Sequence, residues 1–231
     1  MKERESLQGA KTKFVGDDKA GTFFCAVSKK IAYLEIKKSG CTTFKNFILQ
    51  LEGRQDIIES NPLGVHTEEV LKEMTRVPKA LCTEGFFKFT FVRHPFGRVF
   101  SFWKNKIISW DRGIEAALRQ HGFYPSMQWE SFIDKLYEIP AFDLEAHIAP
   151  VTKFLLDGRG NICVDFIGKL ETIERDSERL AAETGLNVVF PHYNKGVVTK
   201  DVMWTDDIRS KLAEKYMADL EVLDYSATEW L

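Results

Sequence analysis

The feature that most constrains the fold of this chain is an apolar run that passes through a short basic loop into a helical pattern, at residues 31–48 (IAYLEIKKSGCTTFKNFI). Residues 31–36 are rich in β-formers and predict a strand. Beyond the loop, apolar residues recur at helical spacing, at Phe44, Phe47, Ile48 and Leu51. The stretch therefore predicts a strand, a tight loop and a helix.

The loop at residues 37–40 is suited to binding an anion. A loop that enters a helix points backbone N–H groups and the positive end of the helix dipole at one spot. Lys37 and Lys38 add two positive charges there, and Gly40 would let the backbone approach the anion closely. We expect a phosphate or sulfate site. Taken alone, the loop could also be an ordinary strand-to-helix turn with solvated lysines.

Two known phosphate-binding loops do not fit this stretch. The ATP-binding P-loop needs G-x-x-x-x-G-K-[ST], but here the upstream glycine is missing and Lys38 precedes Gly40 instead of following it. A Cys-x5-Arg phosphatase loop also fails, because the residue six positions after Cys41 is Phe47. The sequence disfavours both a standard nucleoside-triphosphate site and a phosphatase site.

A second strand, loop and helix follows at residues 86–107. Residues 86–93 (FFKFTFVR) are mostly apolar, as in a buried parallel strand, and Pro95 can start the next helix. Ligands of open α/β sheets bind at the carboxyl ends of the strands. We therefore expect the loops at Lys38 and Arg93 to lie along the same edge of one sheet.

Four segments resemble sulfotransferases, in particular the carbohydrate sulfotransferase branch. Residues 38–44 (KSGCTTF) look like the 5′-phosphosulfate loop Pro-Lys-x-Gly-(Cys)-Thr-x-(Trp/Phe), with Lys37 in place of the usual proline. Residues 91–103 (FVRHPFGRVFSFW) look like the signature FVR-(Asp/Glu)-PF-x-R-x-x-S, with His94 in place of the acidic residue. Residues 145–150 and 164–176 (VDFIGKLETIERD) are similar to two further segments of that branch.

This resemblance implies a donor, an acceptor class and a set of binding residues. The donor is 3′-phosphoadenosine 5′-phosphosulfate, the product is 3′-phosphoadenosine 5′-phosphate, and no metal is required. The sulfuryl group would pass by in-line displacement to a hydroxyl of a carbohydrate or another small acceptor. The implied donor-binding residues are Lys38, Ser39, Gly40, Cys41, Thr42 and Thr43 at the 5′-phosphosulfate, Arg93 and Ser101 at the 3′-phosphate, and Lys195 and Gly196 over the nucleotide.

The catalytic residues are less well defined by the sequence than the binding loops. Lys38 is expected to stabilise the charge that builds on the bridging oxygen, and a general base must remove the acceptor's proton. His66 is the first candidate for this base, because glycan sulfotransferases place a histidine or glutamate in the corresponding region. His147, within a branch motif, is the second candidate, and Glu68 or Glu84 are the remaining alternatives.

The implied fold is three-layered α/β, a P-loop-like sulfotransferase fold with a mostly parallel sheet of about 4–5 strands flanked by helices. We expect one domain over residues 1–231, with residues 1–20 as a peripheral N-terminus. Residues 53–64 and 113–128 are expected to be irregular. Further helices are expected at about 67–74, 129–137, 172–185 and 206–220, and a further strand at 164–168.

The amino-acid composition limits which binding partners and which cellular compartment we expect for this chain. A formal net charge of −2 argues against a nucleic-acid binder, so an anionic ligand must be met by a local cluster of positive charge. The four cysteines form no C-x-x-C pair, which favours a reducing compartment. No apolar run approaches the ~18 residues of a membrane span, so we expect a cytoplasmic protein. The sequence does not indicate an oligomeric state.

Two other functions stay open at this point. One is a non-catalytic module that binds a phosphoadenosine nucleotide or a sulfated glycan, because an inactive relative can keep the cofactor motifs. The other is an atypical P-loop kinase, which would need an acidic strand end to hold magnesium. The two main strands end in Ile36 and Arg93, so the kinase is the weaker alternative.

Overall fold

The computed structural model describes residues 21–79, 85–110, 112–141, 143–188, 190 and 202–228. The chain groups into two compact units, the first drawn from residues 1–92 and 154–195 and the second from residues 93–153 and 196–231. Compact units of this size can belong to one domain, so a single domain over residues 1–231 stays a prediction. Among the described residues, no helix combines the length and apolar composition that a membrane crossing requires.

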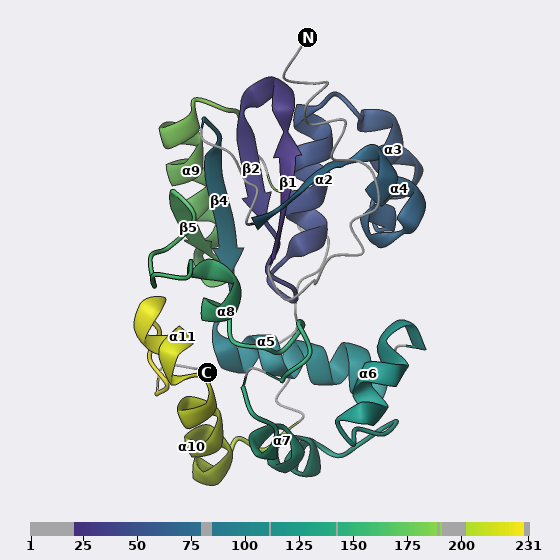
Figure 1. The fold of residues 1–231 in the computed structure, drawn as a ribbon, viewed down its shortest axis with the longest axis vertical. Coiled ribbons are helices and arrows are strands. Elements are labelled where there is room, and N and C mark those ends of the chain that lie inside the picture. Colours follow the sequence, from purple (N-terminus) through teal and green to yellow (C-terminus); the bar gives the residue numbers. More distant parts are fainter. Residues whose placement is uncertain are drawn as a thin grey trace. The chain divides into compact units, whose positions relative to one another are not determined.

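The first unit is built on a five-stranded sheet with the order β3-β1-β2-β4-β5 (Figure 1). Strands β2, β4 and β5 are parallel, whereas β1 pairs antiparallel with both β2 and β3. This confirms the predicted α/β fold class with a sheet flanked by helices. The strands and α-helices of this unit are β1 (Thr22–Ala26), β2 (Ile31–Leu34), α2 (Cys41–Leu51), α3 (Gln55–Ser60), α4 (Glu68–Glu73), β3 (Thr75–Pro78), β4 (Phe87–Val92), β5 (Phe166–Lys169) and α9 (Ile173–Thr184).

The parallel pairing of β2 with β4 decides where the two predicted loops lie. Ile31 pairs with Phe87 and Tyr33 with Phe89, so the two strands run in register toward the same edge of the sheet. The loop at residues 37–40 follows β2 at that edge, and Arg93 is the first residue after β4. Both segments therefore begin at neighbouring carboxyl ends of strands, as the sequence predicts.

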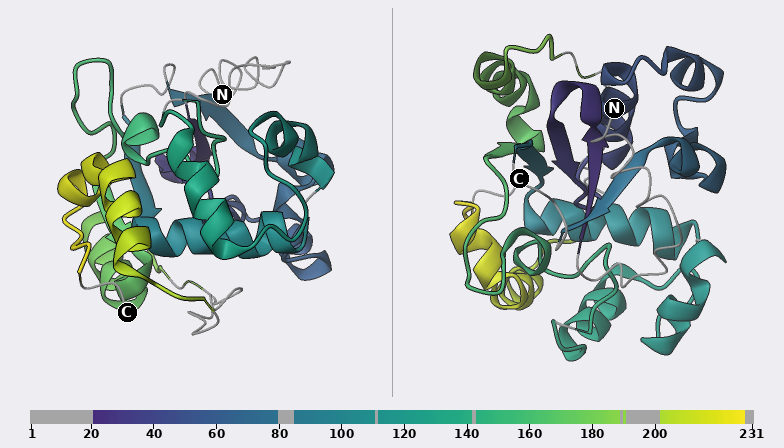
Figure 2. Two further views of the ribbon diagram at one scale, coloured as in Figure 1. Left: turned by 90° about the horizontal axis from the view of Figure 1, so that it is seen from below. Right: turned by 45° about the horizontal axis from the view of Figure 1, so that its top comes forward.

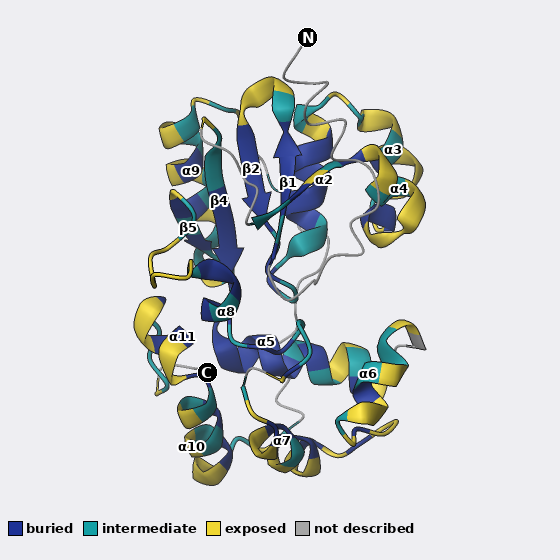
Figure 3. Cartoon of the chain, in the orientation of Figure 1, coloured by how far each residue is buried: buried dark blue, intermediate teal, exposed yellow. Residues whose placement is uncertain are grey.

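One face of the sheet is covered by α2 and α9 (Figures 2 and 3). Apolar side chains of both helices join a single core with those of the sheet. The ring of Phe44 from α2 stacks on that of Phe91 from β4, with ring centroids 4.4 Å apart. Gly168 of β5 lies against the same ring, because a Cβ placed there would approach Phe91 to 2.3 Å. The glycine of the 164–176 motif therefore makes room for an aromatic core residue.

Several short elements were not predicted. Residues 55–60, expected to be irregular, form α3, whose Ile58 is buried in the core of the first unit. Residues 75–78 form β3 beside β1, and residues 115–120 form α6 within the predicted irregular insert. Such short segments carry little intrinsic preference, so packing decides their structure.

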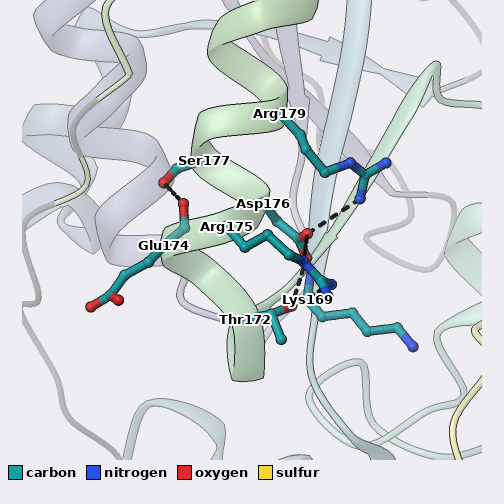
Figure 4. A network of polar contacts seen from close by, with 7 residues as sticks. All are labelled: Lys169, Thr172, Glu174, Arg175, Asp176, Ser177 and Arg179. Carbon is teal, nitrogen blue, oxygen red and sulfur yellow. Dashed lines mark hydrogen bonds and ion pairs between the residues drawn. The ribbon is translucent and has the colours of Figure 1, made fainter.

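The turn from β5 to α9 is organised by the buried carboxylate of Asp176 (Figure 4). It accepts a hydrogen bond of 2.8 Å from the backbone N–H of Lys169 and another of 2.8 Å from the Thr172 hydroxyl. Arg175 and Arg179 donate to its other oxygen at 3.1 and 3.2 Å. Thr172 is the N-cap residue of α9 by position, but its hydroxyl contacts Asp176 and makes no capping hydrogen bond. Burial works against the charge, but these donors outweigh it and hold the pKa of Asp176 below its ordinary value.

Replacing Asp176 with Asn should destabilise the chain by about 1–3 kcal/mol at pH 7, since the amide offers one acceptor fewer to these donors. The lowered pKa means that the carboxylate stabilises the fold above the pKa of an unfolded aspartate, about 3.9, and that this contribution falls as the pH drops through the folded value. Urea denaturation measures the free energy of unfolding of both proteins. The difference between the wild type and Asp176→Asn should be constant between pH 7 and 5 and should narrow below about pH 4. Glu174→Gln, at an exposed position two residues earlier in α9, should leave stability unchanged; a similar loss of stability in that variant would contradict the role given to Asp176.

The second unit is helical in the described residues. Its elements are α5 (Pro95–Phe102), a π-helical turn (Trp103–Ile108), α6 (Glu115–Gln120), α7 (Trp129–Glu138), α10 (Asp206–Lys215) and α11 (Met217–Val222), while α8 (Thr152–Leu155) spans the boundary between the units. The fully buried Arg98 and Asp219 form its internal ion pair, with 3.8 Å between Nη1 and Oδ2. Asp219 also accepts from the N–H groups of Val151 and Thr152 at 2.7 and 2.9 Å. Arg98, the second arginine of the 91–103 motif, therefore supports the packing of this unit from a buried position.

Candidate functional site

The loop after β2 is a tight turn that leads directly into the first residue of α2. Lys38 and Gly40 both have positive φ, 65° and 80°, which turns the chain sharply into α2. A Cβ on Gly40 would lie 3.1 Å from side-chain atoms of Leu170 and Phe44, so both conformation and space favour glycine there. The loop is therefore a fixed turn that joins the strand to the first residue of the helix.

The donors at the start of α2 match a phosphate or sulfate group. The first hydrogen bond of the helix runs from the Thr43 N–H to the Gly40 carbonyl at 2.9 Å. The N–H groups of Cys41 and Thr42 come before that bond, where a helix has no internal acceptors for them. Ser39 is fully buried, and its hydroxyl has no hydrogen-bond partner among the described residues. Amide and hydroxyl donors are therefore present at the start of α2, in the same loop as Lys38, and such donors are what a phosphate or sulfate site needs.

A polar cluster brings His66 against this loop. His66 ends the short helical turn Gly64–His66, and its Nε2 lies 3.0 Å from the Thr42 hydroxyl and 3.8 Å from the Cys41 sulfur. Its Nδ1 lies 3.2 Å from Nζ of Lys45, which in turn forms an ion pair of 2.6 Å with Glu35. The structure therefore places the first predicted base beside the predicted phosphosulfate loop.

Charge within this cluster is balanced. Burial alone would raise the pKa of Glu35, but the Lys45 ammonium outweighs it and the pKa lies below its ordinary value. Burial, helped by the negative charge of Glu35, raises the pKa of the Cys41 thiol. Cys41 is therefore held as a neutral thiol, which agrees with a binding role better than with a nucleophilic one.

The same cluster contains a possible set of metal ligands. Ligand atoms of Glu35, Cys41 and His66 lie within 4.8 Å of one another, the only such group found among the described residues. The Lys45 ammonium, however, contacts both Glu35 and His66. A divalent cation would have to displace this positive charge and deprotonate Cys41. In the arrangement seen here, an ammonium group bridges the ligands that a metal would need.

Arg93 and Ser101, predicted at the 3′-phosphate, belong to the second unit, and both are half-buried. Between them, His94 is the N-cap of α5: its Nδ1 accepts from the Phe96 N–H at 3.2 Å, and its Nε2 donates to the Ser226 carbonyl at 3.0 Å. A carboxylate can cap a helix in the same way. His94 thus fills a capping role that an acidic residue could also fill.

His147 lies against a carboxylate in the second unit. Its Nδ1 is 2.8 Å from both oxygens of Glu145, and its backbone N–H donates to the same side chain at 2.8 Å. An ionised carboxylate only accepts hydrogen bonds, so the proton of the neutral ring is on Nδ1 and the lone pair is on Nε2. This is the tautomer that a general base acting through Nε2 needs.

Four predicted residues remain, and three of them are outside the part of the chain that the structure describes. Glu84, Lys195 and Gly196 lie outside the described residues. Glu68 is exposed in the first turn of α4 and lies 3.8 Å from Lys72, the distance of a weak surface ion pair. The sequence analysis did not predict that Glu35 and Lys45 belong to the cluster around His66. The available signal was Glu35, a charged residue within the apolar run 31–36.

Comparison with known proteins shows the family of this chain. The profile of a family described as "Sulfotransferase family" matches residues 21–230. Similar curated proteins are the carbohydrate sulfotransferase 11 of Rattus norvegicus, 26% identical over 235 residues, and that of Mus musculus, 25% identical over 234 residues. Each alignment covers 87% of this chain and 66% of the relative, so the chain spans just under two thirds of their length. No solved structure gives a significant match.

Proposed function

This chain belongs to the sulfotransferase family, and we propose that it transfers a sulfuryl group from 3′-phosphoadenosine 5′-phosphosulfate to a hydroxyl of a carbohydrate or another small acceptor. The observation that carries the proposal is the loop between β2 and α2, where turn geometry and donor set both suit a phosphosulfate. The carbohydrate acceptor is supported by the names of the similar proteins.

The proposed reaction is an in-line displacement at sulfur. The acceptor oxygen forms a bond to sulfur while the bond from sulfur to the bridging oxygen breaks, and the electron pair of that bond leaves with the nucleotide phosphate. Lys38 and the first N–H groups of α2 would stabilise the charge that develops on the leaving oxygen. Arg93 and Ser101 would bind the 3′-phosphate, which does not react and so mainly contributes affinity.

The acceptor's proton must pass to a general base, for which His66 and His147 are the candidates. The hydrogen bond from Nδ1 of His147 to Glu145 supports His147, because it leaves the lone pair on Nε2 and stabilises the imidazolium that forms. His66 has its Nδ1 next to the Lys45 ammonium instead. We therefore propose His147 as the base.

Binding of the product nucleotide tests the donor assignment. 3′-Phosphoadenosine 5′-phosphate at about 100 times its Kd should stabilise the chain by ~2.7 kcal/mol, which for a protein of this size raises the Tm by roughly 5–10 °C. Added EDTA should not reduce the shift, because we propose that no metal is needed. ATP with Mg²⁺ is the control, and stabilisation by it alone would favour a kinase. Turnover of labelled donor with a panel of glycan acceptors would then separate an enzyme from a module that only binds.

A further inference from the structure

We infer that Lys45 is a positioning residue that fixes the tautomer of His66, so that the imidazole presents an N–H group to the phosphosulfate loop. This inference deepens the proposed function, on which its catalytic consequence rests. The tautomer itself follows from the contacts of Lys45 and can be measured without any turnover.

The position of Lys45 is tightly determined. It lies in the second turn of α2 with its side chain 3% exposed, and its Nζ is 2.6 Å from Glu35 Oε1. The same ammonium lies over the ring of Phe24, 4.5 Å from its centroid. Because the pKa of Glu35 is lowered, the carboxylate is ionised at neutral pH and holds the ammonium in place. Lys45 therefore reaches His66 from a fixed site.

The chemistry of an ammonium group decides where the His66 proton lies. An ammonium has three donors and no acceptor, so at 3.2 Å the Nδ1 of His66 must accept the hydrogen bond from Lys45. The neutral ring then carries its proton on Nε2. That nitrogen is 3.0 Å from the Thr42 hydroxyl, to which it can donate. A proton on Nδ1 would instead face the positive charge of Lys45 at hydrogen-bond distance.

His66 consequently acts as a hydrogen-bond donor at the loop and not as a proton acceptor through Nε2. An anion held at the start of α2 can receive this N–H in place of the Thr42 hydroxyl. Such a bond to a charged oxygen strengthens as negative charge builds on it during transfer. His66 would stabilise the transition state, while the acceptor's proton goes to a different group.

Nitrogen-15 NMR of the intact chain with labelled histidine tests this directly, since it reports which ring nitrogen carries the proton. The His66 signal is identified by its loss in His66→Gln. We expect the Nε2–H tautomer in the wild type at a pH where the ring is neutral, and a change in that signal when 3′-phosphoadenosine 5′-phosphate is added. A proton on Nδ1 in the wild type would overturn the inference.

Two variants test whether Lys45 sets the tautomer of His66 or only packs in the core. The double variant Glu35→Gln/Lys45→Met removes the ammonium without leaving a buried carboxylate unpaired, and a fraction of the Nδ1–H tautomer should appear in it. Lys45→Arg keeps a donor-only group and should retain Nε2–H. An undetectable Nδ1–H tautomer in the double variant would overturn the assignment of Lys45. If the double variant fails to fold, the tautomers measured in the wild type and in Lys45→Arg still test the inference, because a proton on Nδ1 in either protein would contradict it. Loss of nucleotide binding with the expected tautomers would contradict the proposed function alone.

Discussion

Lys38→Ala should lower turnover by about 10²–10³-fold while changing the affinity for the donor much less. The reason is the position of Lys38 in the loop between β2 and α2, which we propose to hold the 5′-phosphosulfate. Negative charge grows on the bridging oxygen only as its bond to sulfur breaks, so a cation at this point stabilises the transition state more than the bound donor. Initial rates with labelled donor, over a range of donor concentrations, measure kcat and KM separately.

Arg93→Ala is the informative comparison, because it also removes one positive charge from a residue that we propose to bind the donor. The 3′-phosphate does not react, so Arg93 should stabilise the ground state and the transition state equally. A lost charge-assisted contact of about 1.5–3 kcal/mol should raise the donor's Kd by roughly 10–150-fold with little change in kcat.

A matched control uses Lys29→Ala, which removes an exposed lysine just before β2, at the opposite end of the strand from Lys38. It should behave like the wild type. If Lys38→Ala and Arg93→Ala both altered only the KM for the donor, the role given to Lys38 would be wrong.

The main strands and the tight loop between β2 and α2 could be predicted because their signals are local. Residues 31–36 and 86–93 are apolar runs long enough to indicate buried strands, and the loop at Lys38 lies between a strand pattern and a helix pattern. The α/β topology predicts that the two strands pair in parallel, and the parallel pairing of β2 with β4 confirms this prediction. By contrast, α3 and β3 are too short to show a period, and the packing of Ile58 and the pairing of β3 with β1 determine them.

The polar clusters could not be read from the sequence, because their members are brought together by the fold. Lys45 and His66 are 21 positions apart, and only the chain path through α3 places them 3.2 Å from each other. His94 shows a different limit: its exchange for an acidic residue looks like a change of charge, whereas the structure shows a helix cap that either residue can provide. The pairing of Glu145 with His147 lies within one motif, but the sequence does not show that the carboxylate binds Nδ1.

The largest effect should come from removing the general base. His147→Ala should reduce kcat by about 10²–10⁴-fold and leave binding of 3′-phosphoadenosine 5′-phosphate intact, since the base acts on the acceptor. His66→Ala should also reduce kcat, because it loses a hydrogen-bond donor at the loop. Loss of activity alone therefore does not distinguish the two histidines. His121→Ala, a half-buried histidine after α6, is the matched control and should keep full activity.

The pH dependence of the rate distinguishes them. A base must be unprotonated to act, so the wild-type rate should fall as the pH drops through the titration of that group. This acid limb should disappear in His147→Ala and persist, at a lower overall rate, in His66→Ala. Glu145→Gln should keep the limb but reduce kcat, because the amide stabilises the imidazolium less than a carboxylate does. An acid limb that vanishes in His66→Ala and survives in His147→Ala would make His66 the base, as its place in the sequence first suggests.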